Sequence, residues 1–388
     1  MTKTLEILDR LVGFPTLSSE SNLAIIDYIQ DFLGTRGFTV TQIGDSTGQK
    51  AGLFASLGET KQGGVMLSGH TDVVPVTGQN WASDPFKLRR DGPRVYGRGT
   101  TDMKGYLAAM MSLADRTKGR ALATPLKLAF SFDEEVGCLG IPQMLPLLES
   151  TIGTPAMCFV GEPTEMQIAT GHKGKAALRA IRHGATGHSA QAPNYLNALH
   201  LAADFVAGIR GLQRELERHG TQDKAYDIPY STLHIGKLFG GTALNIVPDH
   251  AQIIFEMRHL AQDATDGLRA RIDRMAAEIA TQYRATHPAA EIEIGQISAY
   301  PGLETAQDAS ISRFAADLLP KGTPYTKVAY GTEAGYFDQA GIPTVVCGPG
   351  NMNQGHKADE FIETDQLAQC DAMFDQLLDR LVAGDISV

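Results

Sequence analysis

The sequence has few cysteines and no long hydrophobic run. Its four cysteines are widely separated and form no CxxC pair, so neither a disulfide framework nor a thiolate zinc site is indicated. No window approaches 18 uninterrupted apolar residues, and the N-terminus lacks a basic stretch followed by an apolar one. We therefore expect a soluble, unexported protein of the reducing cytoplasm.

Positive charge is also in deficit. Lys and Arg number 34 against 44 Asp and Glu, a formal net charge of −10. This balance disfavours attraction to nucleic acid phosphates or to an anionic membrane surface. The 388 residues are 43% hydrophobic, which is ordinary for globular chains. We expect about two or three domains and a small-molecule partner, with no nucleic acid and no membrane.

The order of periodic segments predicts an α/β fold with an insertion. Up to residue 174 and again after 300, short apolar runs alternate with helical segments, ending in a helix at 364–383. Between them the pattern is β-α-β-β-α-β, which makes a self-sufficient antiparallel sheet with two helices on one face. We predict a domain of 1–174 and 300–388 with a mixed, mostly parallel sheet between helices. We expect residues 175–299 to form an inserted ferredoxin-like α+β domain.

Acidic residues and histidines follow several of the predicted strands. His, Asp and Glu are ligands of borderline metals such as zinc, and in α/β proteins ligands gather at the carboxyl ends of strands. Each residue alone is weak evidence, because Asp and Glu are common in turns. Together they predict a metal site, made from His70, Asp72, Asp102, Glu134, Glu135, Glu162 and His356.

The adjacent pair Glu134 and Glu135 predicts a division of roles. Successive side chains of an extended segment diverge, so one carboxylate can ligate a metal while the other faces the attacking water. A dinuclear site needs a shared carboxylate, separate ligands for each ion and one further carboxylate to take a proton. The alternative, a solvated acidic turn, is disfavoured by the buried strand LKLAFSF directly before the pair.

Eight segments over nearly the whole chain resemble the zinc-dependent metallopeptidase family that includes carboxypeptidase G2, aminoacylases, succinyl-diaminopimelate desuccinylase and acetylornithine deacetylase. The segments are GHTDVVPV (69–76), GRGTTDMKG (97–105), SFDEEVGCLG (131–140), GEPT (161–164), TGHSAQAP (186–193), NIVPDH (245–250), YGTEAGYF (330–337) and GPGNMNQGHKADE (348–360). The resemblance implies a metal-dependent hydrolase acting on a linear amide.

Metal and catalytic roles follow from this resemblance. It implies that His70 and Glu162 bind one ion and that Glu135 and His356 bind the other. Asp102 bridges the two ions, and the peptide bond after it is expected to be cis. Glu134 is the implied general base, and the Asp72 carboxylate is expected to orient His70. The ions are most simply zinc, although cobalt and manganese suit the same ligands.

The resemblance also implies that the inserted domain is a lid through which two copies form a homodimer. His188 would reach the partner's active site and stabilise the oxyanion on the scissile carbonyl. Asn245 and Arg258 would hold a substrate carboxylate, Arg258 in a bidentate pair. Gly331 and Thr332 would contact substrate from the other domain. The alternatives are that His188 has no chemical role and that Arg258 is an exposed ion-pair partner.

Within the family, the motifs look most like the acetylornithine deacetylase branch, whose members release acetate and L-ornithine from N2-acetyl-L-ornithine in arginine biosynthesis. Glu333 is a candidate to bind the cationic ornithine side chain, or it only begins the next helix. Thr101 and Thr77 depart from the branch pattern, where Cys and Asp are common. They leave room for acetylcitrulline, another N-acyl-amino acid or a dipeptide as substrate. A catalytically silent binding protein is disfavoured because the Glu134 base and the ligands are all intact.

Overall fold

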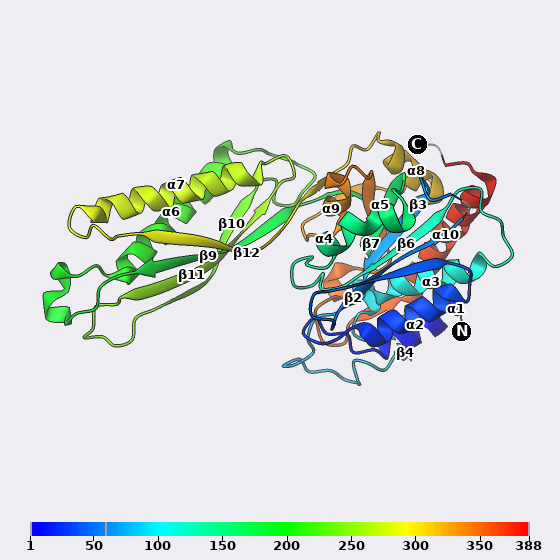
Figure 1. Cartoon of the computed structure of the whole chain (residues 1–388), viewed down its shortest axis with the longest axis horizontal. Helices are drawn as coiled ribbons and strands as arrows, with labels where there is room; N and C mark the ends of the chain where they lie inside the picture. Colours follow the sequence, from blue (N-terminus) through cyan, green and yellow to red (C-terminus); the bar gives the residue numbers. More distant parts are fainter. Residues whose placement is uncertain (1, 59, 387–388) are drawn as a thin grey trace. The chain divides into compact units, whose positions relative to one another are not determined.

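The computed structural model describes residues 2–58 and 60–386. The chain divides into two compact units (Figure 1). The larger unit contains the chain up to Gly171, Leu303–Val328 and the part from Thr332 onward, and the smaller unit contains His172–Gly302 with Ala329–Gly331. The smaller unit is thus an insertion, whose main segment starts at His172 and ends at Gly302, against 175 and 299 in the prediction.

The larger unit is built on a mixed sheet of nine strands among the described residues. The strand order is β1 (Thr39–Gly44), β2 (Ala51–Leu57), β6 (Leu126–Ser131), β3 (Val65–His70), β7 (Met157–Pro163), β15 (Thr344–Gly348), β8 (Ile168–His172) and β13 (Leu303–Glu304), with β14 (Tyr325–Val328) beside β8. Neighbours β6, β3, β7 and β15 run parallel, whereas β1–β2, β2–β6 and β15–β8 are antiparallel. The predicted α/β fold is confirmed, with its parallel part confined to the centre of the sheet.

Helix α3 (Gly105–Arg116) lies in the core of this unit. Every residue from Gly105 to Ala114 is buried, as expected of a helix that is apolar or small on all sides. It packs between strands β3 and β7 and the outer helices α1 (Lys3–Val12) and α10 (Thr364–Ala383). This packing fixes the start of α3, directly after the segment that carries Asp102. The remaining helices of the unit are α2 (Leu23–Gly34), α4 (Ile141–Met144), α5 (Leu148–Ile152), α8 (Ser310–Leu318) and α9 (Ala334–Gln339).

A small antiparallel sheet joins two distant segments of the larger unit. Its strands are β4 (Arg89–Asp91), β5 (Arg94–Tyr96) and β16 (Phe361–Glu363), in the order β16-β5-β4. The sequence did not predict this sheet, because three-residue strands carry no readable periodicity. Pairing of Phe361 with Tyr96 brings residue 360 beside the loop that begins at Gly97.

The smaller unit has the predicted β-α-β-β-α-β order. Its elements are β9 (Gly174–His183), α6 (Ala198–His219), β10 (Thr232–Gly240), β11 (His250–His259), α7 (Thr265–Arg284) and β12 (Ile292–Tyr300). The strand order β10-β11-β9-β12, antiparallel throughout, is that of a ferredoxin-like sheet. Alternate residues of β11, such as Ile253, Phe255 and Met257, are buried with residues of the two helices.

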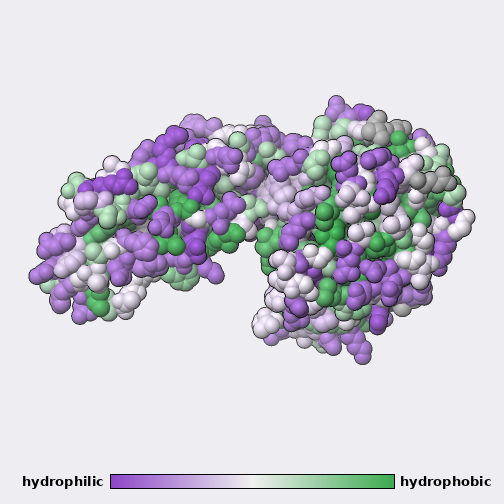
Figure 2. Space-filling model, in the orientation of Figure 1, coloured by the Kyte–Doolittle hydropathy of each residue, from purple (hydrophilic) through white to green (hydrophobic). Residues whose placement is uncertain are grey.

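On the face drawn in Figure 2, hydrophilic residues predominate and apolar residues are scattered among them. Exposed large hydrophobic residues occur on both units; those of the smaller unit include Leu238, Phe239 and Ile297. Over the described ranges, no helix is long and apolar enough to cross a membrane.

Candidate metal centre and active site

The predicted ligands lie at one edge of the central sheet. His70 ends β3, Glu162 is near the end of β7, and Glu134 and Glu135 follow β6. The loop after β15 carries His356, and Asp102 lies in the irregular turn η1 (Thr100–Lys104) before α3. Since β6, β3, β7 and β15 are parallel neighbours, their carboxyl ends deliver these side chains to the same edge.

One group of possible ligands is His70, Asp102 and Glu162. Their donor atoms lie within 4.8 Å of one another, and all three residues are buried. His70 Nε2 is 3.2 Å from Asp102 Oδ1 and 3.6 Å from Glu162 Oε1. This is the geometry of donors facing a common point, which a metal ion can occupy.

A second group is Asp102, Glu135 and His356. His356 Nε2 lies 3.0 Å from Asp102 Oδ2 and 3.0 Å from Glu135 Oε2. Asp102 thus faces one group with Oδ1 and the other with Oδ2, as a bridging carboxylate does. The expected cis peptide bond between Asp102 and Met103 is confirmed. The His356 side chain is 51% exposed, so this second group borders solvent.

The electrostatics of both groups suit a cation. Burial raises the pKa of Glu162 well above its ordinary value and that of Glu135 to about 7. Hydrogen bonds to Asp102 and Glu135 raise the pKa of His356 to about 10. Oε1 of Glu135 is buried and has no hydrogen-bond partner in the described part of the chain. Crowded buried acids with an unsatisfied oxygen are what divalent ions stabilise, so the residues fit two such ions.

Asp72 holds the backbone of the Glu134–Glu135 pair. Its Oδ1 accepts from the Glu134 N–H at 3.1 Å, and its Oδ2 accepts from the Glu135 N–H at 3.3 Å. The Ser18 hydroxyl also donates to Oδ2, at 2.6 Å. His70 Nδ1 lies 2.9 Å from the main-chain oxygen of Asp72 and 3.6 Å from the Asp72 carboxylate. The main-chain oxygen is thus the closer partner for orienting the His70 ring.

Glu134 belongs to neither ligand group among the described residues. The Cys138 thiol donates to its Oε1 at 3.2 Å, a contact that the sequence did not indicate. Desolvation raises the pKa of Glu134 well above its ordinary value, with Glu135 and Glu333 adding to the rise. The neighbouring Asp133, at a φ of 54°, is anchored by Lys50 at 2.7 Å.

His188, Asn245 and Arg258 lie in the smaller unit. His188 is exposed and its Nδ1 accepts from the Ala190 N–H at 3.1 Å. The main-chain oxygen of Asn245 accepts from the Ser189 N–H at 3.0 Å, so the His188 and Asn245 segments are adjacent. Arg258 lies on β11 with its Nε 3.0 Å from Glu256, the ion-pair contact that the alternative interpretation expects.

Thr332 and Glu333 are buried at the start of α9 in the larger unit, whereas Gly331 groups with the smaller one. The Thr332 hydroxyl accepts from the Ala334 N–H at 3.0 Å. Both carboxylate oxygens of Glu333 are buried, and neither has a hydrogen-bond partner within residues 2–58 and 60–386. Burial raises the pKa of Glu333 to about 7, and interaction with Ser131 partly opposes this rise. Glu333 therefore precedes a helix and, among the residues that the structure describes, has no counter-charge at hydrogen-bonding distance.

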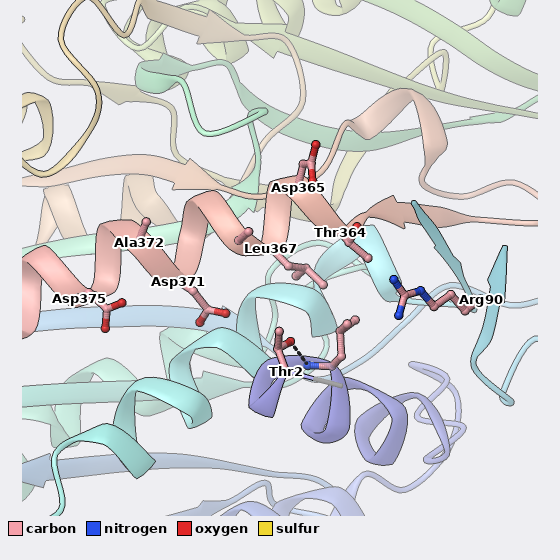
Figure 3. Close-up of a pocket in the computed structure, with 10 residues that line it drawn as sticks. Thr2, Arg90, Thr364, Asp365, Leu367, Asp371, Ala372 and Asp375 are labelled. Carbon is pink, nitrogen blue, oxygen red and sulfur yellow. Dashed lines mark hydrogen bonds between the residues drawn. The ribbon is translucent and has the colours of Figure 1, made fainter. Parts of the chain in front are cut away.

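The larger unit also has a groove away from the candidate site. None of the described residues that line this groove is a predicted site residue. It has a volume of about 750 Å³ and lies between the start of α1 and helix α10 (Figure 3). Its lining includes Arg90 and three acidic residues of α10, Asp365, Asp371 and Asp375. Acidic side chains there are ordinary for an exposed helix face.

The chain is similar to known proteins over most of its length. The sequence pattern of peptidase family M20/M25/M40 matches residues 66–380. An acetylornithine deacetylase of Klebsiella pneumoniae strain 342 is 31% identical over 367 residues, 93% of each chain. Among solved structures, an M20 family metallo-carboxypeptidase from Sulfolobus solfataricus matches with a TM-score of 0.78 and 18% identity, covering 98% of this chain and 99% of that one.

A Bacillus subtilis protein, called a dinuclear metal binding peptidase from the M20 family, matches with a TM-score of 0.66 and 16% identity over 98% of both chains. These two structural matches establish the fold, and the sequence match covers more than half of the chain. The chain therefore belongs to peptidase family M20/M25/M40, and it is a hydrolase of that family.

Proposed function

We propose that this hydrolase is a dinuclear-metal deacetylase that converts N2-acetyl-L-ornithine to L-ornithine and acetate in arginine biosynthesis. The observation that carries the proposal is a pair of ligand groups sharing Asp102, with Glu134 next to them but in neither. The name of the Klebsiella relative supports the choice of substrate. The free, buried cysteines suit the reducing cytoplasm, where we infer that the protein acts.

Five side chains would hold the ions. We assign His70 and Glu162 to one, Glu135 and His356 to the other, and Asp102 to both. Zinc is the first choice, with cobalt and manganese compatible with the same donors. Bound divalent ions would lower the pKa of a water molecule and polarise the substrate carbonyl.

Glu134 is assigned as the general base. Since Cys138 donates to its Oε1, Oε2 is the oxygen that takes a proton from the attacking water. The same carboxyl then gives the proton to the amine nitrogen as the amide bond breaks. Asp72 supports this role by holding the Glu134 main chain, so that the carboxylate keeps its direction while its proton is exchanged.

The smaller unit is assigned as a lid that joins two copies into a homodimer. Strand β10 is at the edge of its sheet, and Leu238 and Phe239 on it are half exposed. An unpaired edge with apolar side chains is suited to pairing with a second chain. In such a dimer His188 would stabilise the oxyanion in the partner's active site.

Substrate contacts are assigned to residues of both units. Asn245 and Arg258 would bind the substrate carboxylate, and Gly331 and Thr332 would line its path. Glu333 would receive the ornithine ammonium group; this is supported by the buried Glu333 carboxylate, which has no hydrogen-bond partner among the described residues. In Glu333→Gln, kcat/KM is expected to fall for acetylornithine but not for acetylcitrulline, whose side chain is neutral. An equal fall in kcat/KM for both substrates would show that Glu333 does not bind the ornithine side chain and only begins helix α9.

The central test is the initial rate of amine release by metal-loaded protein. The panel is N2-acetyl-L-ornithine, acetylcitrulline, acetylmethionine, succinyl-diaminopimelate and a dipeptide, with Glu134→Ala as the control. We expect acetylornithine to be the best substrate and the variant to lose most of the rate. If another compound of the panel is the best substrate, the proposed hydrolytic mechanism stands and the assignment of acetylornithine as substrate is wrong. Equal inertness of both proteins on the whole panel would indicate a binding protein.

A further inference from the structure

A second buried carboxylate, Glu360, holds the loop that carries Asp102. Its Oε1 accepts from the main-chain N–H groups of Thr101 at 2.9 Å and Asp102 at 3.1 Å. Its Oε2 accepts from the Gly99 N–H at 3.0 Å and from Arg98 Nη1 at 2.6 Å. The carboxylate is thus saturated by donors of one short segment. This repeats the arrangement at Asp72, which binds the N–H groups of Glu134 and Glu135.

Arg98 and Glu360 form an ion pair, and further hydrogen bonds connect Arg98 to the loop that carries His356. Arg98 and Glu360 are each 1% exposed. Arg98 Nη2 donates to Gln79 Oε1 at 2.6 Å, and that oxygen also accepts from the Trp81 ring N–H at 3.0 Å. Gln79 Nε2 donates in turn to the main-chain oxygen of His356 at 3.0 Å. The chain of contacts therefore joins the backbone of Asp102 to that of His356.

These contacts close a ring, because the side chains of Asp102 and His356 also meet, with His356 Nε2 3.0 Å from Asp102 Oδ2. A buried ion pair adds little net stability compared with apolar residues of similar size. The contribution of the Arg98–Glu360 pair is to position backbone. Glu360 holds the backbone at Asp102, and Arg98 acts through Gln79 on the backbone at His356. His356 is half exposed and at a φ of 60°, a conformation that persists only where surrounding contacts hold it.

We propose that Glu360, Arg98 and Gln79 are positioning residues that set the separation of Asp102 and His356 and thereby the affinity for the second metal ion. This inference rests on the proposed dinuclear site. It is independent of the substrate, because the three residues act on the ligand backbone. Partners that orient metal ligands typically change metal affinity by about 10- to 100-fold when they are removed.

Two variants break the ring at different points. Gln79→Glu keeps the oxygen that accepts from Arg98 and Trp81 but cannot donate to the His356 carbonyl. Glu360→Gln keeps the size of the side chain but removes its charge and one acceptor. Asp371→Asn is the matched control: Asp371 also pairs with an arginine, at 3.3 Å from Arg116 Nη2, but it lies in the groove of Figure 3.

The experiment is calorimetric titration of Zn²⁺ or Co²⁺ into metal-free full-length protein, with thermal unfolding of each metal-free variant measured in parallel. We expect two ions to bind the wild type. In Gln79→Glu and Glu360→Gln the weaker site should lose about 10- to 100-fold in affinity. Asp371→Asn should bind both ions as the wild type does, even if it unfolds at a lower temperature.

Wild-type affinity for both ions in folded Gln79→Glu would overturn the inference, and so would a wild type that binds fewer than two ions. Should Glu360→Gln fail to fold, Gln79→Glu decides, since it alters a partly exposed side chain. No substrate is present in this experiment. A wild type that binds two ions but hydrolyses nothing on the panel would therefore refute the proposed function alone.

Discussion

The replacement Asp72→Asn should loosen the segment that carries Glu134, the proposed general base. The Asp72 carboxylate offers two acceptor oxygens to three donors: the N–H groups of Glu134 and Glu135, and the Ser18 hydroxyl. An amide has only one acceptor oxygen, so its NH₂ group must face at least one main-chain N–H. The geometry of the side chain is otherwise preserved.

The magnitude follows from these contacts. Hydrogen bonds to charged groups contribute about 1.5–3 kcal/mol each, and at least one such bond is lost. The free energy of unfolding should therefore fall by about 2–3 kcal/mol. The larger effect should be on kcat, because the unpaired N–H lets the Glu134 segment shift, and a displacement of about 1 Å costs about 100-fold in rate.

Ser18→Ala is the matched control, because it removes the hydroxyl donor at the same carboxylate and leaves both N–H contacts in place. It should destabilise the protein by about 1.5–3 kcal/mol with little change in kcat. The assay is kcat at saturating metal and substrate, with urea unfolding of each variant. If folded Asp72→Asn had the same kcat as Ser18→Ala, the reasoning that Asp72 positions the base would be refuted.

Removal of metal by a chelator should abolish hydrolysis and lower the unfolding temperature, because ions at about 100 times their Kd stabilise the folded state by about 2.7 kcal/mol. Calorimetry with and without chelator measures the unfolding temperature. An unchanged unfolding transition would contradict the prediction. Glu134→Gln should lower kcat by about 10²- to 10⁴-fold while metal affinity is retained. The control Asp133→Asn should mainly destabilise the loop that Lys50 anchors. Equal kcat values in the two variants would count against Glu134 as the base. Burial lowers the pKa of His172 from 6.5 to about 4, so the unfolded chain takes up the proton first as the pH falls. This histidine's contribution should be fully present above pH about 6.5 and should decline by about 3 kcal/mol toward pH 4, a slope that disappears in His172→Gln.

Strongly periodic segments were predictable. The closing helix was predicted at 364–383 and is α10, Thr364–Ala383, since its apolar face repeats over five turns. The β-α-β-β-α-β insertion was predictable for the same reason. The three-stranded sheet of β4, β5 and β16 was not, because its strands are short and β16 is far away in sequence.

The types and order of the site residues were determined by the sequence alone. Histidines and acids directly after buried strands predict a metal site because parallel strands bring their carboxyl ends to one edge. Only the tertiary structure decided which atoms meet. The Arg98–Glu360 pair spans 262 residues, and the Asp72 carboxylate lies nearer to the Glu134 and Glu135 N–H groups than to the His70 ring. Such contacts depend on how whole elements pack, and no local pattern encodes the partner of a buried charge.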